Sequence, residues 1–148
     1  MRISKPKEQT KKLLNKRLTN DLVTQGRSQG EELIIALLRL SFPGLKIVRN
    51  DKSVLGRQEI DIHIPTHKIA IEVQGITHYR EIYGAQRFIE SQERDARKKK
   101  NLEELGFTLI EINISNFTKE NLYQELKKYA NAVLIPQIKI IIQSQTLP

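Results

Sequence analysis

The 148-residue chain holds 25 lysines and arginines against 17 aspartates and glutamates, which gives a formal net charge of +8, and it has no cysteine. Disulfide bonds and thiolate metal sites are therefore excluded, and no apolar run approaches the length needed to span a membrane. A chain of this length predicts one main domain, and its positive charge indicates a polyanionic partner. We expect a soluble, cytoplasmic protein that does not bind a membrane.

The positive charge is concentrated near the N-terminus. Residues 1–30 hold eight basic side chains and two acidic ones, so they carry six of the eight net positive charges. Leucine recurs at every fourth position from Leu14 to Leu22, which predicts an amphipathic helix over 7–24. We assign 1–27 as a basic helical arm; the alternative is a solvated basic helix without a partner. The side chains that we expect to bind phosphate groups are Lys5, Lys7, Lys11, Lys12, Lys16 and Arg17.

A core domain over 28–134 is expected to follow the arm. Ser28 is suited to cap a helix that runs to Leu40. After this helix we predict a strand over 45–50 and a loop over 51–56. The chain therefore enters its sheet directly after one helix.

Two short strands joined by a turn at Pro65 form the most informative segment. Their polar and apolar residues alternate, so successive side chains point to opposite faces of a sheet. Asp61 on the first strand is thus expected to share a patch with Glu72 and Gln74 on the second. Two carboxylates and an amide carbonyl suit Mg²⁺, which prefers oxygen ligands. The apolar residues expected together on the opposite face are Ile60, Ile62, Ile64, Ile69, Ile71 and Val73.

The next elements complete an α/β pattern. A loop over 76–87, which we expect to face the substrate, precedes a helix over 88–105 that ends before Gly106. A strand over 107–114 is expected inside the sheet, covered on both faces. The order helix, three strands, helix, strand, helix predicts an α/β sandwich with a mixed sheet.

The C-terminal region begins with a helix that Asn116 or Thr118 is suited to cap. Three alternatives fit the tail over 135–148: an edge strand, a segment covered by an oligomer partner, and a poorly ordered end. The helix side chains expected to point inward are Leu122, Leu126, Tyr129 and Val133.

Glu31 is a candidate for the acidic patch. It precedes Ile34 and Ile35 by three and four residues, which places it on the flank of the apolar stripe of its helix. From there it can complete a metal site or orient a metal-bound water. The alternative is an acid of the first helical turn, favoured by the helix dipole.

Lys98 is a second candidate from a helix. Together with Asp95 it shares a face with Leu102 and Leu105, so both charged side chains are expected to look inward. A lysine there can reach a phosphate as a point charge and stabilise charge that builds in a transition state. The alternative is a local ion pair at the helix edge.

These residues together resemble the PD-(D/E)XK superfamily, the restriction-endonuclease-like nucleases. The resemblance covers about residues 28–114 and implies a restriction-endonuclease-like αβββαβ core, with a mixed central sheet flanked by helices. The stretches that carry the match are Gly30-Glu31, Asp61, Glu72-Val73-Gln74 and Asp95-Ala96-Arg97-Lys98.

Two positions depart from the motif of this superfamily. Ile60 stands before Asp61 where the motif has proline, and Gln74 stands where most members carry the motif lysine. Some members, among them an intron-encoded homing endonuclease, resemble this chain in having glutamine there. In others a lysine from the neighbouring helix replaces the motif lysine, and Lys98 is suited to that role.

The resemblance implies a Mg²⁺-dependent endonuclease, with Mn²⁺ as a substitute, that hydrolyses phosphodiester bonds of double-stranded DNA. A site-specific homing-type enzyme is favoured; a Holliday-junction resolvase, a nicking repair nuclease and an inactive DNA-binding module are the alternatives. Cutting both strands calls for two active sites, so we expect a homodimer or homotetramer, associated with the nucleoid when it binds DNA. The implied catalytic residues are Glu31, Asp61, Glu72, Gln74 and Lys98, of which Asp61, Glu72 and Glu31 hold the metal.

Overall fold

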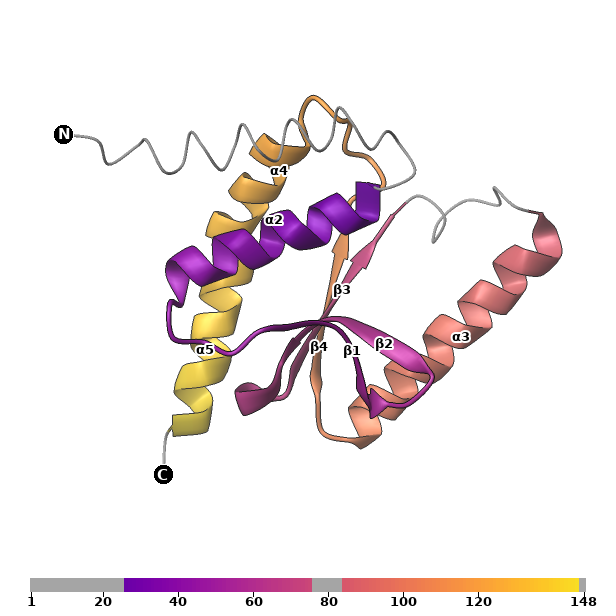
Figure 1. Cartoon of the computed structure of the whole chain (residues 1–148), viewed down its shortest axis with the longest axis horizontal. Helices are drawn as coiled ribbons and strands as arrows, with labels where there is room; N and C mark the ends of the chain where they lie inside the picture. The colour runs from indigo at the N-terminus through magenta and orange to yellow at the C-terminus, as the bar shows by residue number, and fades with distance from the viewer. Residues whose placement is uncertain (1–25, 76–83, 147–148) are drawn as a thin grey trace.

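The computed structural model describes residues 26–75 and 84–146 and shows a four-stranded mixed sheet with helices (Figure 1). The strands lie in the order β1-β2-β3-β4; the pairs β1/β2 and β2/β3 are antiparallel, and the pair β3/β4 is parallel. The expected α/β class with a mixed sheet is confirmed. The bounds of the strands are β1 (Val48–Leu55), β2 (Gln58–Ile64), β3 (Ile69–Gln74) and β4 (Thr108–Asn113).

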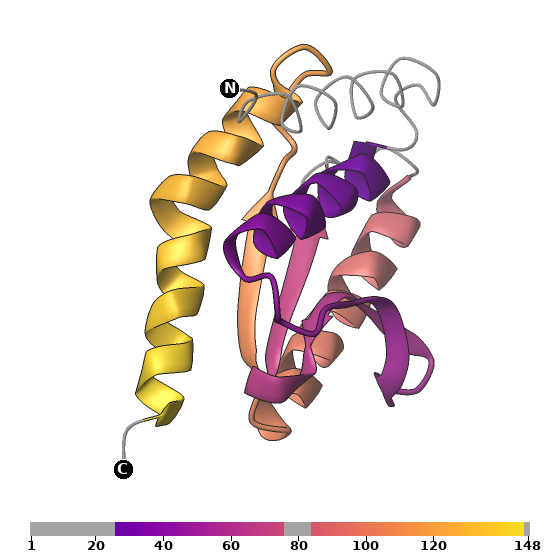
Figure 2. The ribbon, with the colours of Figure 1, turned by 60° about the vertical axis from the view of Figure 1, so that its left-hand side comes forward.

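Helices cover both faces of the sheet, as the two views show (Figures 1 and 2). Helix α2 (Gly26–Ser41) and the C-terminal helices α4 (Leu122–Tyr129) and α5 (Ile135–Thr146) lie on one side, and α3 (Ala85–Glu104) lies on the other. The larger apolar core lies under α2 and α4, and a smaller cluster of Ile60, Ala70 and Leu102 lies under α3. None of the helices in the described ranges combines the length and the apolar character that a membrane crossing requires.

The first described elements differ from their expected bounds. Helix α2 already includes Gly26 and Arg27, so position 28 lies within the helix and not at its N-cap. Strand β1 continues to Leu55, so the loop expected over 51–56 is wrong. β1 is an edge strand with several exposed residues, and its polar sequence therefore lacks the apolar alternation of a buried strand.

The isoleucines of β2 do not all share one face. Ile62 and Ile64 pair with Ile71 and Ile69 and belong to the larger core, whereas Ile60 packs in the smaller cluster under α3. The single face expected for all three is wrong: the β2/β3 pairing ends at Ile62, and Ile60, which lies beyond it, is paired with Asp51 of β1. The expected common face therefore holds for Ile62 and Ile64, which are paired with β3, and not for Ile60.

The second half of the sheet confirms some expectations and corrects others. Helix α3 begins at Ala85, three residues earlier than predicted, and Gly106 adopts the expected left-handed conformation, with φ of 83°, beyond its end. Strand β4 lies at the edge of the sheet, so its expected interior position is wrong. The predicted arm helix over 7–24, the six phosphate-binding side chains of the arm, and positions 76–83 of the predicted loop lie outside the described residues.

The C-terminal region is helical to Thr146, which excludes the edge strand considered for 135–148. The N-cap of α4 is Asn121, so the cap expected at Asn116 or Thr118 is wrong. Thr118 and Asn121 instead bond to each other before the helix: the hydroxyl of Thr118 accepts from the backbone of Asn121, and the side chain of Asn121 accepts from the backbone of Thr118. A π-helical turn over 130–134 separates α4 from α5, and the second residue of α5 is Pro136, which has no N–H to donate. The wider turn shifts the helical period, so Val133, expected inward, is 45% exposed while Leu134 is buried.

Candidate active site

Asp61 and Glu72 meet where β2 leaves its ladder with β3. The backbone N–H of Asp61 donates to Oε2 of Glu72, and the backbone N–H of Val73 donates to Oδ2 of Asp61, each at 2.9 Å. These bonds begin where the regular pairing ends, at Ile62 and Ile71. Each carboxylate is therefore held by the backbone of the opposite strand and keeps one oxygen that these contacts do not use.

The predicted meeting of Asp61 and Glu72 is thus shown, and Lys98 joins them. Nζ of Lys98 donates to Oε1 of Glu72 from helix α3. Asp61 is 6% exposed, and the side chains of Glu72 and Lys98 are 13% and 15% exposed. A half-enclosed ion pair of this kind is screened less by water than a surface pair.

The environment of Glu72 disfavours its negative charge. Its pKa is raised to about 6, first because burial disfavours the charged form and second because Asp61 lies close, while Lys98 partly offsets both effects. A positive ion between the two carboxylates would relieve their mutual repulsion. The electrostatics therefore favour a cation at this position.

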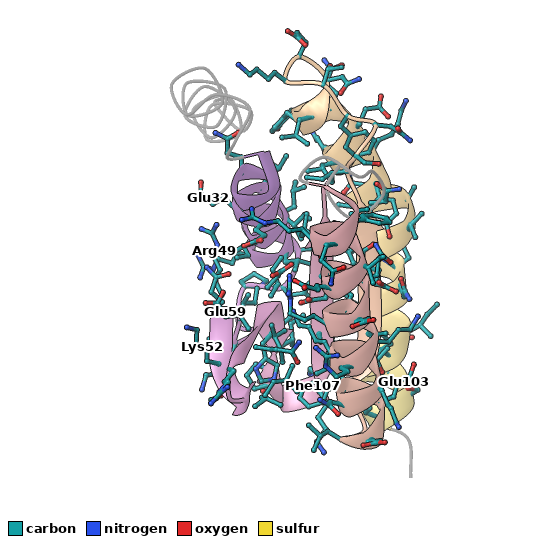
Figure 3. All side chains as sticks on the ribbon, turned by 90° about the vertical axis from the view of Figure 1, so that its right-hand side faces the viewer. Glu32, Arg49, Lys52, Glu59, Glu103 and Phe107 are labelled. Atoms are coloured by element: carbon teal, nitrogen blue, oxygen red, sulfur yellow. The ribbon has the colours of Figure 1, made fainter. Side chains whose placement is uncertain are left out.

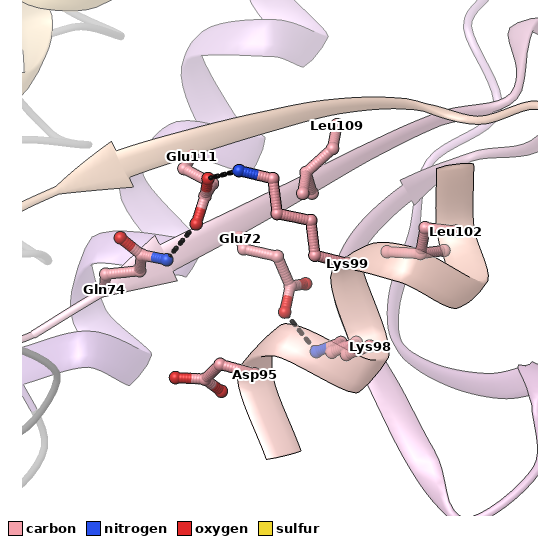
Figure 4. Close-up of a pocket in the computed structure, with 8 residues that line it drawn as sticks. All are labelled: Glu72, Gln74, Asp95, Lys98, Lys99, Leu102, Leu109 and Glu111. Carbon is pink, nitrogen blue, oxygen red and sulfur yellow. Dashed lines mark hydrogen bonds and ion pairs between the residues drawn. The ribbon is translucent and has the colours of Figure 1, made fainter. Parts of the chain in front are cut away.

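Glu72 also lines a small pocket between β3, β4 and α3 (Figure 4). Asp95, Lys98 and Leu102 of α3 face this pocket as predicted, whereas Leu105 is 46% exposed at the end of the helix. The residues that line the pocket are Glu72, Gln74, Asp95, Lys98, Lys99, Leu102, Leu109 and Glu111.

Glu111 is a site residue that the sequence did not reveal. It lies directly opposite Glu72 in the parallel β3/β4 pairing, so two carboxylates stand side by side on one face. Like charges in that arrangement repel, and consecutive lysines of α3 offset this: Lys98 bonds to Glu72 and Lys99 to Glu111, the latter at 3.5 Å. The other oxygen of Glu111 accepts from Nε2 of Gln74.

Glu31 lies apart from this group. Its side chain is 2% exposed and accepts from Nε of Arg49 at 3.2 Å. The same guanidinium bonds to Glu32 at 3.2 Å, and Figure 3 shows Arg49 and Glu32 near each other. Arg49 pairs with Ile62 across β1 and β2, so it shares the face that α2 covers. Across the described ranges, no three His, Cys, Asp or Glu side chains gather as a metal site, so Glu31 is not brought to Asp61 and Glu72. The first-turn alternative for Glu31 also fails, because α2 begins at Gly26.

His63, two residues after Asp61 on β2, is bound elsewhere. Its Nδ1 lies 2.7 Å from Oδ2 of Asp51, and its ring packs against Phe107. This hydrogen bond is the main reason why the pKa of Asp51 is lowered to about 2. The pair joins β1 to β2 beside the smaller apolar cluster.

Comparison with known proteins gives no family for this chain: no family model matches it, and no curated protein is significantly similar in sequence. Its function is therefore argued from the site.

Proposed function

We propose that this protein is a Mg²⁺-dependent endonuclease that hydrolyses phosphodiester bonds of double-stranded DNA on a restriction-endonuclease-like αβββαβ core. The observation that carries the proposal is that the backbone of each strand holds the carboxylate of the other, at Asp61 and Glu72. Lys98 donates to the carboxylate of Glu72. The order α2, β1, β2, β3, α3, β4 is compatible with that core. The sequence resemblance involves the same residues.

The residues of the site fit Mg²⁺. This ion commonly binds through one or two carboxylates together with waters and phosphate oxygens, so Asp61 and Glu72 are a sufficient protein contribution. When bound, the ion supplies activation of a water and polarisation of the phosphate, and Mn²⁺ can take its place. The pKa of Glu72 is raised although Lys98 contacts its carboxylate, because burial and Asp61 outweigh that one positive charge, and this agrees with a site that an added cation would stabilise.

The side chains around the carboxylates have distinct proposed roles. Lys98 supplies a positive point charge to the phosphate. Its ammonium, which donates to Glu72 in the protein alone, can donate to a phosphate oxygen when DNA is bound. Gln74 orients the attacking water. Glu31 remains with Arg49 and supports the packing of α2 on β1.

DNA affinity is proposed to come mainly from the basic arm, whose side chains contact phosphates without reading sequence. The favoured enzyme is site-specific and homing-like, and two copies are proposed to cut the two strands. A junction resolvase or a nicking nuclease would use the same residues on a different substrate.

The deciding experiment is cleavage of a library of random DNA duplexes by the purified full-length protein, with Mg²⁺, with Mn²⁺ and with a chelator. We expect metal-dependent cleavage by the wild type and by Glu125→Gln, which changes an acid of α4, and no cleavage by Glu72→Gln. If the wild type binds the library but leaves it intact with both metals, the proposed nuclease activity is excluded, and the alternative of an inactive DNA-binding module is supported instead.

A further inference from the structure

Gln74 and Glu111 are joined in a way that limits what Gln74 can do. Gln74 is the last residue of β3, and Glu111 lies on the adjacent strand β4, opposite Glu72. The two side chains share the face that α3 covers, and Nε2 of Gln74 donates to Oε2 of Glu111. Figure 4 shows the amide nitrogen directed at Glu111 and the carbonyl oxygen directed away from it.

The chemistry of the two groups fixes the direction of this amide. An ionised carboxylate only accepts hydrogen bonds, so Glu111 can bind the amide nitrogen of Gln74 but not its oxygen. A bond to a charged acceptor is also stronger than one between neutral groups. Turning the amide over would lose that bond and bring two oxygens together.

Lys99 holds the other oxygen of Glu111. Its Nζ lies 3.5 Å from Oε1, and the side chains of Lys99 and Glu111 are 53% and 39% exposed. An exposed pair contributes little by itself. The bond to Gln74 is therefore the main contact through which Glu111 can influence the site.

We propose that Glu111 is a positioning residue, which holds Gln74 so that its carbonyl oxygen, an acceptor, serves the reaction. This inference rests on the proposed nuclease function and deepens it. A lysine in place of Gln74 would only donate, whereas the held amide accepts from the attacking water or ligates the cation. Lys98 of α3 is then the hydrogen-bond donor of the site, and Gln74 of β3 is the acceptor.

The first measurement is independent of activity. In the full-length protein, the side-chain NH₂ resonances of Gln74 are assigned by their loss in Gln74→Met and compared between the wild type and Glu111→Ala. We expect one proton of the wild-type amide to lie downfield and to return to the ordinary range in Glu111→Ala. Unchanged resonances in that variant overturn the proposal.

The second measurement separates chemistry from binding. Single-turnover cleavage by Glu111→Ala is expected to be about 10- to 100-fold slower, with the Kd for DNA within about twofold of wild type. The double variant with Gln74→Met should be no slower than Gln74→Met alone, since the two residues act as one unit. Losses that multiply, or a wild-type rate in Glu111→Ala, overturn the inference and leave the nuclease intact. A wild type that cuts no DNA overturns the proposed function instead.

Discussion

Asp61 and Glu72 each accept a hydrogen bond from the backbone of the strand that carries the other, Asp61 from Val73 N–H and Glu72 from Asp61 N–H, both at 2.9 Å. The two carboxylates thus serve as the last links between β2 and β3 and as the proposed cation ligands. A substitution at either position changes both properties unless it preserves the acceptor oxygen. The choice of variant can therefore separate stability from chemistry.

Asp61→Asn and Asp61→Ala should differ in stability but not in activity. Asparagine keeps an oxygen for the N–H of Val73, whereas alanine leaves that buried donor unpaired, at a cost of about 1–3 kcal/mol in the free energy of unfolding. Both should lose cleavage by more than about 100-fold, because each lacks an ionised ligand. Urea unfolding and a cleavage assay check the two statements. An Asp61→Asn protein that cuts at the wild-type rate would disprove the metal site.

The free energy of unfolding of the metal-free protein should depend on pH through Glu72. Its folded pKa of about 6 lies above the ordinary value of 4.5, so the folded state binds this proton more tightly than the unfolded state. The resulting stabilisation is full below pH 4.5 and is lost as the pH rises through 6, a change of about 2 kcal/mol. Asp51, with its pKa lowered to about 2, does not titrate in this window.

Urea unfolding at several pH values in a chelator, for the wild type and Glu72→Gln, measures this dependence. Glu72→Gln cannot ionise, so its free energy of unfolding should fall less between pH 4.5 and 7. Glu125→Gln is the matched control, because it removes one acid from α4 and should keep the wild-type slope. Identical slopes for the wild type and Glu72→Gln would contradict the prediction.

The proximity of Asp61 and Glu72 could be predicted because it depends on the alternation of polar and apolar residues along two neighbouring strands. Both acids interrupt runs of isoleucine and valine, and the turn at Pro65 makes the two strands neighbours. The inward position of Lys98 followed in the same way from the helical spacing to Leu102. A pattern in sequence is reliable where one period and one short connection determine which residues meet.

Glu31 and Glu111 could not be placed from sequence, because each depends on a contact between distant segments. Glu31 lies on the edge of an apolar stripe, and it is Arg49 of the neighbouring strand that determines its partner. Glu111 reaches Gln74 only through the parallel register of β3 and β4, which a helix separates in the chain. The isoleucine-rich tail shows the same limit: its pattern fits a strand, but a helix buries Ile135 and Ile138 against the core.

Lys98→Met should slow cleavage by about 100-fold, because it removes the proposed charge for the phosphate. Lys100→Met is the matched control: it removes one positive charge from the same helix at an exposed position. We expect both variants to bind DNA with similar affinity and only Lys98→Met to lose rate in a single-turnover assay. Equal cleavage rates for the two variants would show that Lys98 only neutralises the charge of Glu72 and does not act on the phosphate.

The basic arm should determine the salt dependence of DNA binding. Each lysine or arginine that contacts a phosphate contributes about 0.9 to the slope of log K against log salt, through the release of condensed counterions. Replacing four arm residues by glutamine should therefore lower the slope by up to about 3.6. The four are Lys11, Lys12, Lys16 and Arg17.

A matched variant separates contact from overall charge. It replaces four exposed lysines of the described region by glutamine, at Lys46, Lys119, Lys128 and Lys139, and so removes the same total charge. If the arm contacts phosphates, the arm variant has a smaller salt slope than the matched variant. Both variants lose the same long-range attraction to DNA, but only the arm variant loses direct contacts that release counterions. Titrations of labelled duplex DNA at increasing salt measure the two slopes, and equal slopes would assign the arm no direct contact with DNA.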